Sequence, residues 1–373
     1  MTIIIFLIIL GLLVLSHEFG HFYVAKKSGA RVDEFGFGFP PRIWSRKYGE
    51  TTYSLNLIPF GGFVKIYGED PDEESLTGRD RKRAMSAQSK WRQALVLVAG
   101  VTANLILAWL LLIIAFATTG LPTRLDSVPT GYTLENPQVT IVHVEPKSPA
   151  ALGGLMAGDQ IVHLRTIEGR LTDPSVGQVQ EYIKSHADSE IVVGYIRNHG
   201  PSIKPTIAEV AVRPMKNEAS GQAVIGVGLD TIGQLHLPIH RSILAGTQST
   251  WHLLSGTVIG LGTLVADLFG GKSGTLDQVT GPIGLVGLVG DASAMGFGYL
   301  LLFTALISIN LAVLNLLPIP ALDGGRLLFL LIERIKGRPI TPKIANAVNM
   351  GGFIALMALM LLVTYSDIIK FFT

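Results

Sequence analysis

The chain has no cysteine among its 373 residues. Disulfide bonds, thiolate catalysis and cysteine-based zinc sites are therefore excluded, so any metal ion must be held by histidine and carboxylate side chains. Charged residues make up only 16% of the chain, and the 30 Lys and Arg against 28 Asp and Glu form no long run of one sign. A nucleic-acid-binding arm would need such a run, so we expect no nucleic-acid partner.

Hydrophobic residues make up 48% of the chain, and many lie in long runs. A helix needs about 20 apolar residues to cross the hydrocarbon core of a bilayer. Residues 2–25, 94–119 and 299–321 meet this requirement, and the shorter, glycine-containing residues 347–365 are a fourth candidate. The first run has no Lys or Arg before it and no small-residue cleavage pattern after it, which argues against a cleavable signal peptide. The sequence predicts a polytopic α-helical membrane protein with about four transmembrane helices.

Basic residues indicate how these helices are oriented in the lipid bilayer. They follow the first run from Lys26 to Arg92, and they follow the third run from Arg326 to Lys343. Under the positive-inside rule both connections lie in the cytoplasm, which places both termini outside.

Between the second and third runs the composition is that of a soluble protein, with strand-like segments such as residues 139–144 and 190–196. We expect one extracytoplasmic α+β domain here. Residues 242–270 are moderately apolar but are interrupted by Gly246, Gly256, Gly260 and Gly262, and we interpret them as interfacial or re-entrant. The predicted organisation is a first transmembrane helix (1–25), a cytoplasmic loop with a membrane-associated β segment (26–93), a second helix (94–119), the extracytoplasmic domain (120–230, core about 138–214), an interfacial or re-entrant segment (231–298), a third helix (299–325), a cytoplasmic loop (326–346) and a fourth helix (347–373).

The first apolar run contains His17-Glu18-Phe19-Gly20-His21. Residues four apart share a helix face, so both imidazoles can reach one metal ion, with Glu18 beside them as a candidate general base. Ionisable groups within a membrane helix cost roughly 2.5 to 3.5 kcal/mol each, and a divalent ion would compensate for them. The alternative is that the motif marks the helix end, with its polar groups reaching toward the interface.

A catalytic zinc ion has three protein ligands, so a third ligand must come from elsewhere in the chain. Asp323 is the best candidate, because it follows two helix-breaking prolines and precedes two glycines that permit a tight turn near the ion. An Asp in such a turn is more often a helix-end or Asx-turn residue. The predicted depth of Asp323, on the cytoplasmic side like the two histidines, favours the ligand role. The ligands can converge only if residues 242–270 do not cross the membrane.

These motifs resemble those of the site-2 protease family of intramembrane zinc metalloproteases, and most closely its bacterial regulator of sigma-E branch. The matching residues are His17 to His21, Gly61 to Lys65, Asn104, Gly281 to Gly284 and Asn315 to Gly325. The resemblance implies that His17, His21 and Asp323 bind one catalytic zinc ion, that Glu18 is the catalytic base, and that Asn310 and Asn315 hold the substrate backbone. Two features depart from the family: Val101 replaces a proline before Asn104, and there is room for one extracytoplasmic binding domain instead of two.

Two segments are candidates to handle the substrate. Residues 53–68 alternate like a strand and include Gly61 and Gly62, which predicts a cytoplasmic-side β-hairpin whose exposed edge binds unwound substrate; an ordinary surface hairpin is the alternative. The resemblance implies that this segment is the family's membrane-associated loop. Residues 142–161 resemble the core of a PDZ domain, which binds extended peptides or obstructs access to the site. His143 and His163 lie in this PDZ-like domain, and we interpret both as ordinary sheet or surface histidines.

The favoured function is regulated intramembrane proteolysis in a bacterial inner membrane. The expected partners are single-span membrane proteins, such as anti-sigma factors, and signal-peptide remnants. One alternative is a non-enzymatic membrane scaffold bearing a PDZ-like domain, which need not hold stoichiometric zinc. Another is a zinc transporter, which would need a polar path across the bilayer, whereas the polar residues here gather near one face.

Overall fold

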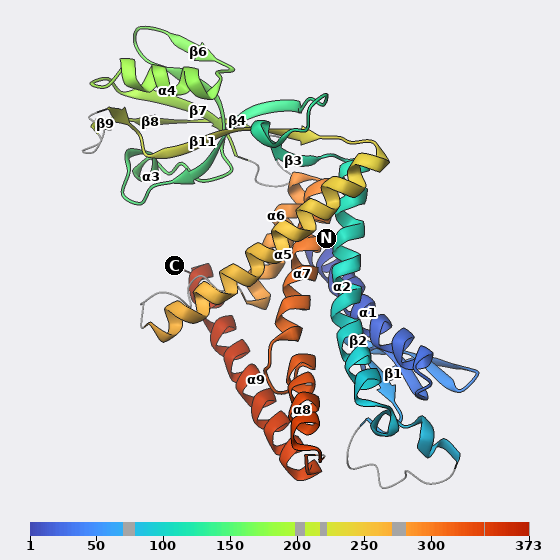
Figure 1. The fold of residues 1–373 in the computed structure, drawn as a ribbon. Coiled ribbons are helices and arrows are strands. Elements are labelled where there is room, and N and C mark those ends of the chain that lie inside the picture. Colours follow the sequence, from blue (N-terminus) through green and yellow to red (C-terminus); the bar gives the residue numbers. More distant parts are fainter. Residues whose placement is uncertain (70–78, 198–205, 217–221, 271–280, 339, 373) are drawn as a thin grey trace. The chain divides into compact units, whose positions relative to one another are not determined.

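The computed structural model describes residues 1–69, 79–197, 206–216, 222–270, 281–338 and 340–372 (Figure 1). The chain divides into two compact units. We call the first the helical unit and the second the sheet unit. The helical unit comprises Met1–Leu112, Gly246–Val289 and Phe303–Thr373, and the sheet unit comprises Ile113–Ala245 and Gly290–Leu302.

Four helices are long and apolar enough to cross a membrane. They are α1 (Thr2–Lys27), α2 (Lys90–Thr118), α7 (Phe297–Leu316) and α9 (Pro342–Phe372). Each coincides with one of the four predicted runs, although α7 ends before the predicted residue 321. The reason is local: a proline disfavours the helical conformation in the residue before it and cannot donate a helical hydrogen bond, and Pro318 and Pro320 follow directly.

Three further helices accompany them: α5 (Ile239–Phe269), α6 (Pro282–Met295) and α8 (Asp323–Lys336). α5 is one continuous helix that runs through Gly246, Gly256, Gly260 and Gly262, and it is not among the candidate membrane spans found in the described part of the chain. The interfacial placement of this segment stays a prediction. Residues 271–280 of the predicted segment lie outside the described residues.

Small residues allow α1 and α2 to pack closely. A Cβ atom built on Gly20 would lie 2.3 Å from the carbonyl oxygen of Ala99, so no larger residue fits at position 20. Nearby, the Ser16 hydroxyl donates a hydrogen bond to the carbonyl oxygen of Ala103 at 3.2 Å. Helices surrounded by lipid gain little from burying apolar surface, so their association depends on close contacts and interhelical hydrogen bonds of this kind.

Between α1 and α2, strands β1 (Val32–Tyr48) and β2 (Thr51–Ile66) form a two-stranded antiparallel sheet, as the alternation of residues 53–68 led us to expect. The Thr51 hydroxyl donates to the carbonyl oxygen of Val32 at 2.8 Å and so joins the first residues of the two strands. Its predicted association with the membrane stays a prediction.

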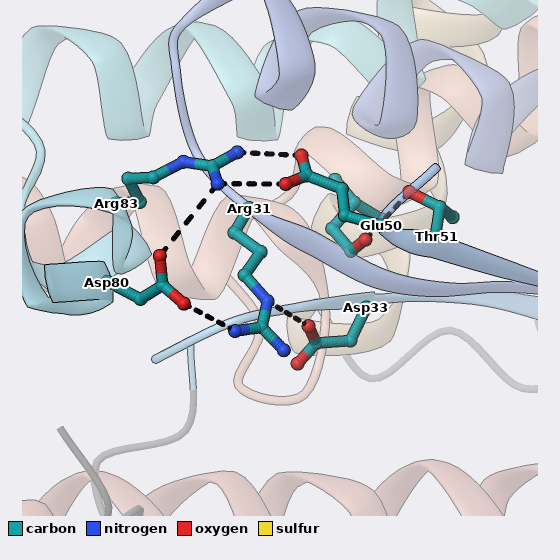
Figure 2. Close-up of polar contacts among 7 residues, drawn as sticks. Arg31, Asp33, Glu50, Thr51, Asp80 and Arg83 are labelled. Atoms are coloured by element: carbon teal, nitrogen blue, oxygen red, sulfur yellow. Dashed lines mark hydrogen bonds and ion pairs between the residues drawn. The ribbon is translucent and has the colours of Figure 1, made fainter. Parts of the chain in front are cut away.

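The segment before α2 contains the short 3-10 helices η1 (Arg79–Arg83) and η2 (Met85–Ala87), and ion pairs tie it to this sheet. Figure 2 shows the Arg83 guanidinium donating two hydrogen bonds to Glu50, at 2.6 and 2.8 Å. Arg31 in turn bridges Asp33 at 2.7 Å and Asp80 at 2.8 Å. These contacts fix the end of the loop between the sheet and α2.

The sheet unit contains a seven-stranded sheet in the order β3-β11-β4-β5-β7-β8, with β6 paired to β5. The bounds are β3 (Leu121–Arg124), β4 (Glu135–Val144), β5 (Gln160–Arg165), β6 (Arg170–Thr172), β7 (Ile191–Ile196), β8 (Ile207–Val212) and β11 (Val227–Leu235). The smaller elements are η3 (Leu125–Ser127), α3 (Pro149–Leu152), α4 (Val176–Ser185), β9 (Met215–Lys216) and β10 (Ala223–Val224).

The core of the sheet unit is aliphatic, with Ile141, Leu164 and Ile191 fully buried. Figure 1 shows α4 and α3 on opposite sides of the strands, and both contribute side chains to this core. α4 begins with a capping box, in which the Ser175 hydroxyl accepts from the Gln178 backbone and the Gln178 side chain accepts from the Ser175 backbone. The predicted strands at residues 139–144 and 190–196 are β4 and β7, so the α+β composition is as expected.

Candidate metal centre

Two histidines and one aspartate meet inside the helical unit. His17 and His21 lie one turn apart on α1, and their Nε2 atoms are 3.0 Å apart. Asp323 is the first residue of α8, and its Oδ2 lies 3.1 Å from His17 Nε2 and 3.3 Å from His21 Nε2. All three side chains are between 11% and 16% exposed. The structure thus brings together the three residues that the sequence predicted as metal ligands.

The second ring nitrogen of His21 is held by α2. Its Nδ1 lies 2.8 Å from the carbonyl oxygen of Val96. A carbonyl oxygen can only accept a hydrogen bond, so Nδ1 carries the proton and Nε2 presents a lone pair to His17 and Asp323. Metal-binding histidines typically donate their other N–H to a carbonyl or carboxylate in this way, because the bond sets the tautomer and the ring orientation.

The spacing of the three ligand atoms suits a zinc ion. Tetrahedral zinc with bonds of about 2.0 to 2.1 Å keeps its ligand atoms roughly 3.3 Å apart. The observed separations of 3.0 to 3.3 Å fall close to this value. Asp323 Oδ2 has no hydrogen-bond partner among the described residues, and the lone pair of His21 Nε2 faces it. A cation bound between them would satisfy both groups, and the residues present fit it.

A sharp return of the chain after α7 positions Asp323. A Cβ atom on Gly324 would lie 2.0 Å from the Leu317 carbonyl oxygen, and one on Gly325 would lie 2.3 Å from that of Ile319. Only glycine permits this close approach. Asp323 lies at a helix end, as the alternative interpretation expected, and its Oδ2 faces the two histidines. The helix-end position and the ligand role are therefore compatible.

A glycine of α2 makes room for the two imidazoles. A Cβ atom on Gly100 would lie 2.4 Å from His21 Nε2 and 2.7 Å from His17 Cε1. Sequence analysis gave Gly100 no role, although a glycine within an apolar helix is itself a signal of close packing. Gly100 therefore belongs to the site as the residue that lets α2 approach the ligands.

Two cavities adjoin the ligands, and Glu18 lines both. The first, of about 400 Å³, also has charged walls formed by Lys65, Glu69 and Arg326, of which the last two are ion-paired. The second, of about 300 Å³, has a mixed lining of aliphatic, glycine and polar residues. Its lining residues are Leu13, Val14, His17, Glu18, Gly61, Gly62, Asn104, Leu311, Asn315, Ala321, Leu322 and Asp323.

Three of the four predicted substrate-binding residues, Gly61, Gly62 and Asn315, line this second cavity. β2 approaches α1 closely there, since a Cβ atom on Gly62 would lie 3.2 Å from Glu18 Cγ. Asn310 lies elsewhere: its Oδ1 accepts a hydrogen bond from the Thr257 hydroxyl of α5 at 2.8 Å, and it lines neither cavity. Of the two asparagines of α7, Asn315 therefore lines the cavity beside the metal ligands and Asn310 does not.

The remaining predicted residues lie as follows. His163 of the PDZ-like segment is 1% exposed and bonds the Glu209 carboxylate at 3.0 Å, within the sheet. His143 lies on the neighbouring strand β4. Among the described residues the one group of three or more ligand-type side chains that could hold a metal ion is His17, His21 and Asp323.

A protein with several membrane-spanning helices, a buried two-histidine, one-carboxylate centre and a glutamate beside it has the composition of a membrane-embedded metallohydrolase. Comparison with known proteins agrees with this class. The family model described as Peptidase family M50 matches residues 5–359. The chain is 34% identical to “Putative zinc metalloprotease CPE1693” of Clostridium perfringens, over 99% of each chain. It is 29% identical to “Zinc metalloprotease RasP” of Geobacillus kaustophilus, over 100% of this chain and 98% of that protein.

The chain belongs to peptidase family M50. The expected class, a metalloprotease of the site-2 protease family in a multi-pass membrane protein, is thereby confirmed. The non-enzymatic scaffold is no longer needed as an alternative.

Proposed function

We propose that this enzyme is an intramembrane zinc endopeptidase in which His17, His21 and Asp323 hold one zinc ion and Glu18 is the general base. The observation that carries the proposal is the convergence of three lone-pair-bearing atoms within 3.3 Å of one another. The relatives named above are described as zinc metalloproteases, which supports the choice of metal.

Glu18 is the residue placed to move the proton. Zinc, when bound, acts as a Lewis acid and lowers the pKa of water toward about 7. Glu18 lines both cavities that adjoin the ligands, so its carboxylate can take a proton from water in one and deliver it to the leaving amine in the other. The bond from His21 to the Val96 carbonyl keeps the imidazole turned toward the ion throughout.

The two cavities have walls suited to different occupants. Lys65, Glu69 and Arg326 make the larger cavity polar enough to admit water. The smaller cavity combines aliphatic side chains and two amides with Glu18 and the metal ligands, which suits an extended peptide whose main chain reaches the ion. Gly61 and Gly62 bring the β2 backbone to its edge, where a substrate strand can pair with main-chain groups. Pairing of this kind holds unwound substrate, whose carbonyl groups would otherwise stay in helical hydrogen bonds.

The substrates we propose are single-span membrane proteins, including anti-sigma-factor-like proteins and signal-peptide remnants, in a bacterial cytoplasmic membrane. The basic residues after α1 and after α7 support cytoplasmic placement of both connections and extracytoplasmic placement of both termini. On this orientation the sheet unit is extracytoplasmic. A cavity of about 280 Å³ between α4 and strands β10 and β11 suits it to receive an extended peptide, as a PDZ-like domain does.

Glu18→Gln in the full chain, reconstituted with single-span membrane proteins, tests this proposal. The substitution removes the proton acceptor and leaves all three ligands, so one zinc ion per chain should remain while cleavage is lost. Glu34→Gln, which changes a carboxylate that pairs with Arg42 on the sheet, is the matched control and should cleave normally. Near-normal turnover by Glu18→Gln would exclude the assigned role, and a wild-type protein that cleaves nothing with zinc bound would count against the proposed substrates.

A further inference from the structure

The Asn104 side chain is an unpaired amide in the interior of the helical unit. Asn104 lies on α2 and is 1% exposed. Neither its Oδ1 nor its Nδ2 has a hydrogen-bond partner among the described residues. Burying an amide without a partner is unfavourable, and a membrane-embedded helix offers no bulk water to compensate. An apolar residue of similar size would be expected at this position if packing were its only role.

The amide lines the smaller of the two cavities beside the metal ligands. Glu18 and Asn315 line the same cavity, and so do Gly61 and Gly62 of β2. Asn104 therefore shares a space with the proposed general base and with the strand edge proposed to bind substrate.

The backbone at Asn104 is held in place from two sides. The Ser308 hydroxyl of α7 donates to the Asn104 carbonyl oxygen at 2.7 Å. The preceding carbonyl, of Ala103, accepts from the Ser16 hydroxyl of α1 at 3.2 Å. Because three helices are joined at this point, the side-chain amide is positioned in advance while its own polar atoms are left available. That combination is typical of a binding residue.

An asparagine side chain offers two N–H donors and one acceptor oxygen. An extended peptide presents alternating N–H and C=O groups, and one amide can bond to both kinds. Such bonds are independent of the substrate's side chains, which suits an enzyme that must hold an extended main chain. We propose that Asn104 binds the main chain of the substrate next to the bond that is cleaved, in the cavity that the β2 edge also lines. This inference rests on the proposed peptidase function.

The test compares Asn104→Leu with the wild type in the reconstituted full-length enzyme, using the single-span protein that the wild type cleaves. Leucine keeps the approximate volume and removes both hydrogen-bonding groups. We expect kcat/KM to fall at least ten-fold, with one zinc ion per chain and a melting temperature equal to or above that of the wild type. In the Glu18→Gln background, which is expected to bind substrate without cutting it, Asn104→Leu should raise the substrate Kd by a similar factor. Thr102→Val on the same helix removes a hydroxyl that bonds only within α2, and it should change neither value.

A purely structural role for Asn104 makes different predictions. If kcat/KM stays within two-fold of the wild type, or if its loss is accompanied by loss of zinc or a lower melting temperature, the proposal is overturned. Asn104→Ala, which needs no extra space, provides the same comparison if the leucine variant does not fold. A wild-type enzyme that fails to cleave, or an active Glu18→Gln variant, would instead count against the proposed function, so the two failures are distinguishable.

Discussion

The two units treat their buried polar groups differently. In the sheet unit the buried carboxylate of Asp159, which is 1% exposed, accepts hydrogen bonds from Arg197 at 2.6 Å. In the helical unit, polar atoms of His17, Asn104 and Asp323 have no hydrogen-bond partner among the described residues. Unpaired buried polar atoms are costly and uncommon, so several of them around one pair of cavities indicate a site for a ligand. The Asp159–Arg197 pair stabilises the sheet unit, whereas the unpaired atoms of His17, Asn104 and Asp323 lie around the candidate metal centre.

The largest effect that this comparison predicts is at Gly100. Gly100→Val should abolish zinc binding and lower cleavage at least a hundred-fold, because a Cβ atom at this position would overlap His21 Nε2 at 2.4 Å. Metal analysis of the purified protein, together with the cleavage assay, measures both effects. Gly260→Ala on α5 is the control, since a Cβ atom there meets nothing within 4 Å. Stoichiometric zinc in Gly100→Val would show that the helices are not packed as described.

A smaller and separate effect is expected in the sheet unit. Arg197→Met removes the charged partner of the buried Asp159 carboxylate and leaves the Met156 backbone N–H donating to it at 2.8 Å, which should destabilise this unit by about 3 kcal/mol. Hydrogen exchange of β5 and β7 in the full chain measures the change, and zinc content should stay at the wild-type value. Arg165→Met, which breaks the more exposed pair with Glu209, should cost less than about 1 kcal/mol. Equal effects of the two substitutions would contradict the distinction between buried and exposed pairs.

The smallest effect concerns the ion pairs of Figure 2. The hydrogen bonds from Arg83 lower the pKa of the Glu50 carboxyl below its ordinary value. A lowered pKa in the folded state means that the pair stabilises the protein above the unfolded-state pKa and that this stabilisation disappears as the pH falls through the folded-state pKa.

Glu50 is 39% exposed, so solvent screening limits the contribution of this pair to about 0.5 kcal/mol. Glu50→Gln should lower the free energy of unfolding by this amount at pH 7. Chemical denaturation should show the difference shrinking in acid and in high salt. A difference that is unchanged at pH 3 and in 1 M salt would mean that packing, and not charge, is responsible.

Much of the helical unit could be predicted from the sequence because its signals are local. Apolar runs identify membrane-spanning helices by length, and the four-residue spacing of His17 and His21 places them on one helix face. Counting ligands and comparing depths then led to Asp323, although it lies on another helix. These inferences need no knowledge of how the helices pack against one another.

The sequence could not predict which face of α2 meets α1, because an apolar run that is hydrophobic all round carries no signal for rotation about its axis. The roles of Val96, Gly100 and Asn104 depend on that rotation. Asn310 and Asn315 are a different case. Residues five apart on a helix point about 140° away from each other, so a simple count would have shown that both cannot face one cavity.

X-ray absorption spectroscopy at the zinc edge tests the central claim most directly, when the zinc content and ligand shell of the Glu18→Gln protein are compared with those of the Asp323→Ala protein. The account predicts one zinc ion per chain, surrounded by two imidazole nitrogens and oxygen ligands at about 2.0 to 2.1 Å. It also predicts that Asp323→Ala binds zinc at least about ten-fold more weakly, since loss of even an outer partner of a metal ligand has an effect of that size. Full zinc occupancy with an unchanged spectrum in Asp323→Ala would contradict the three-residue metal centre.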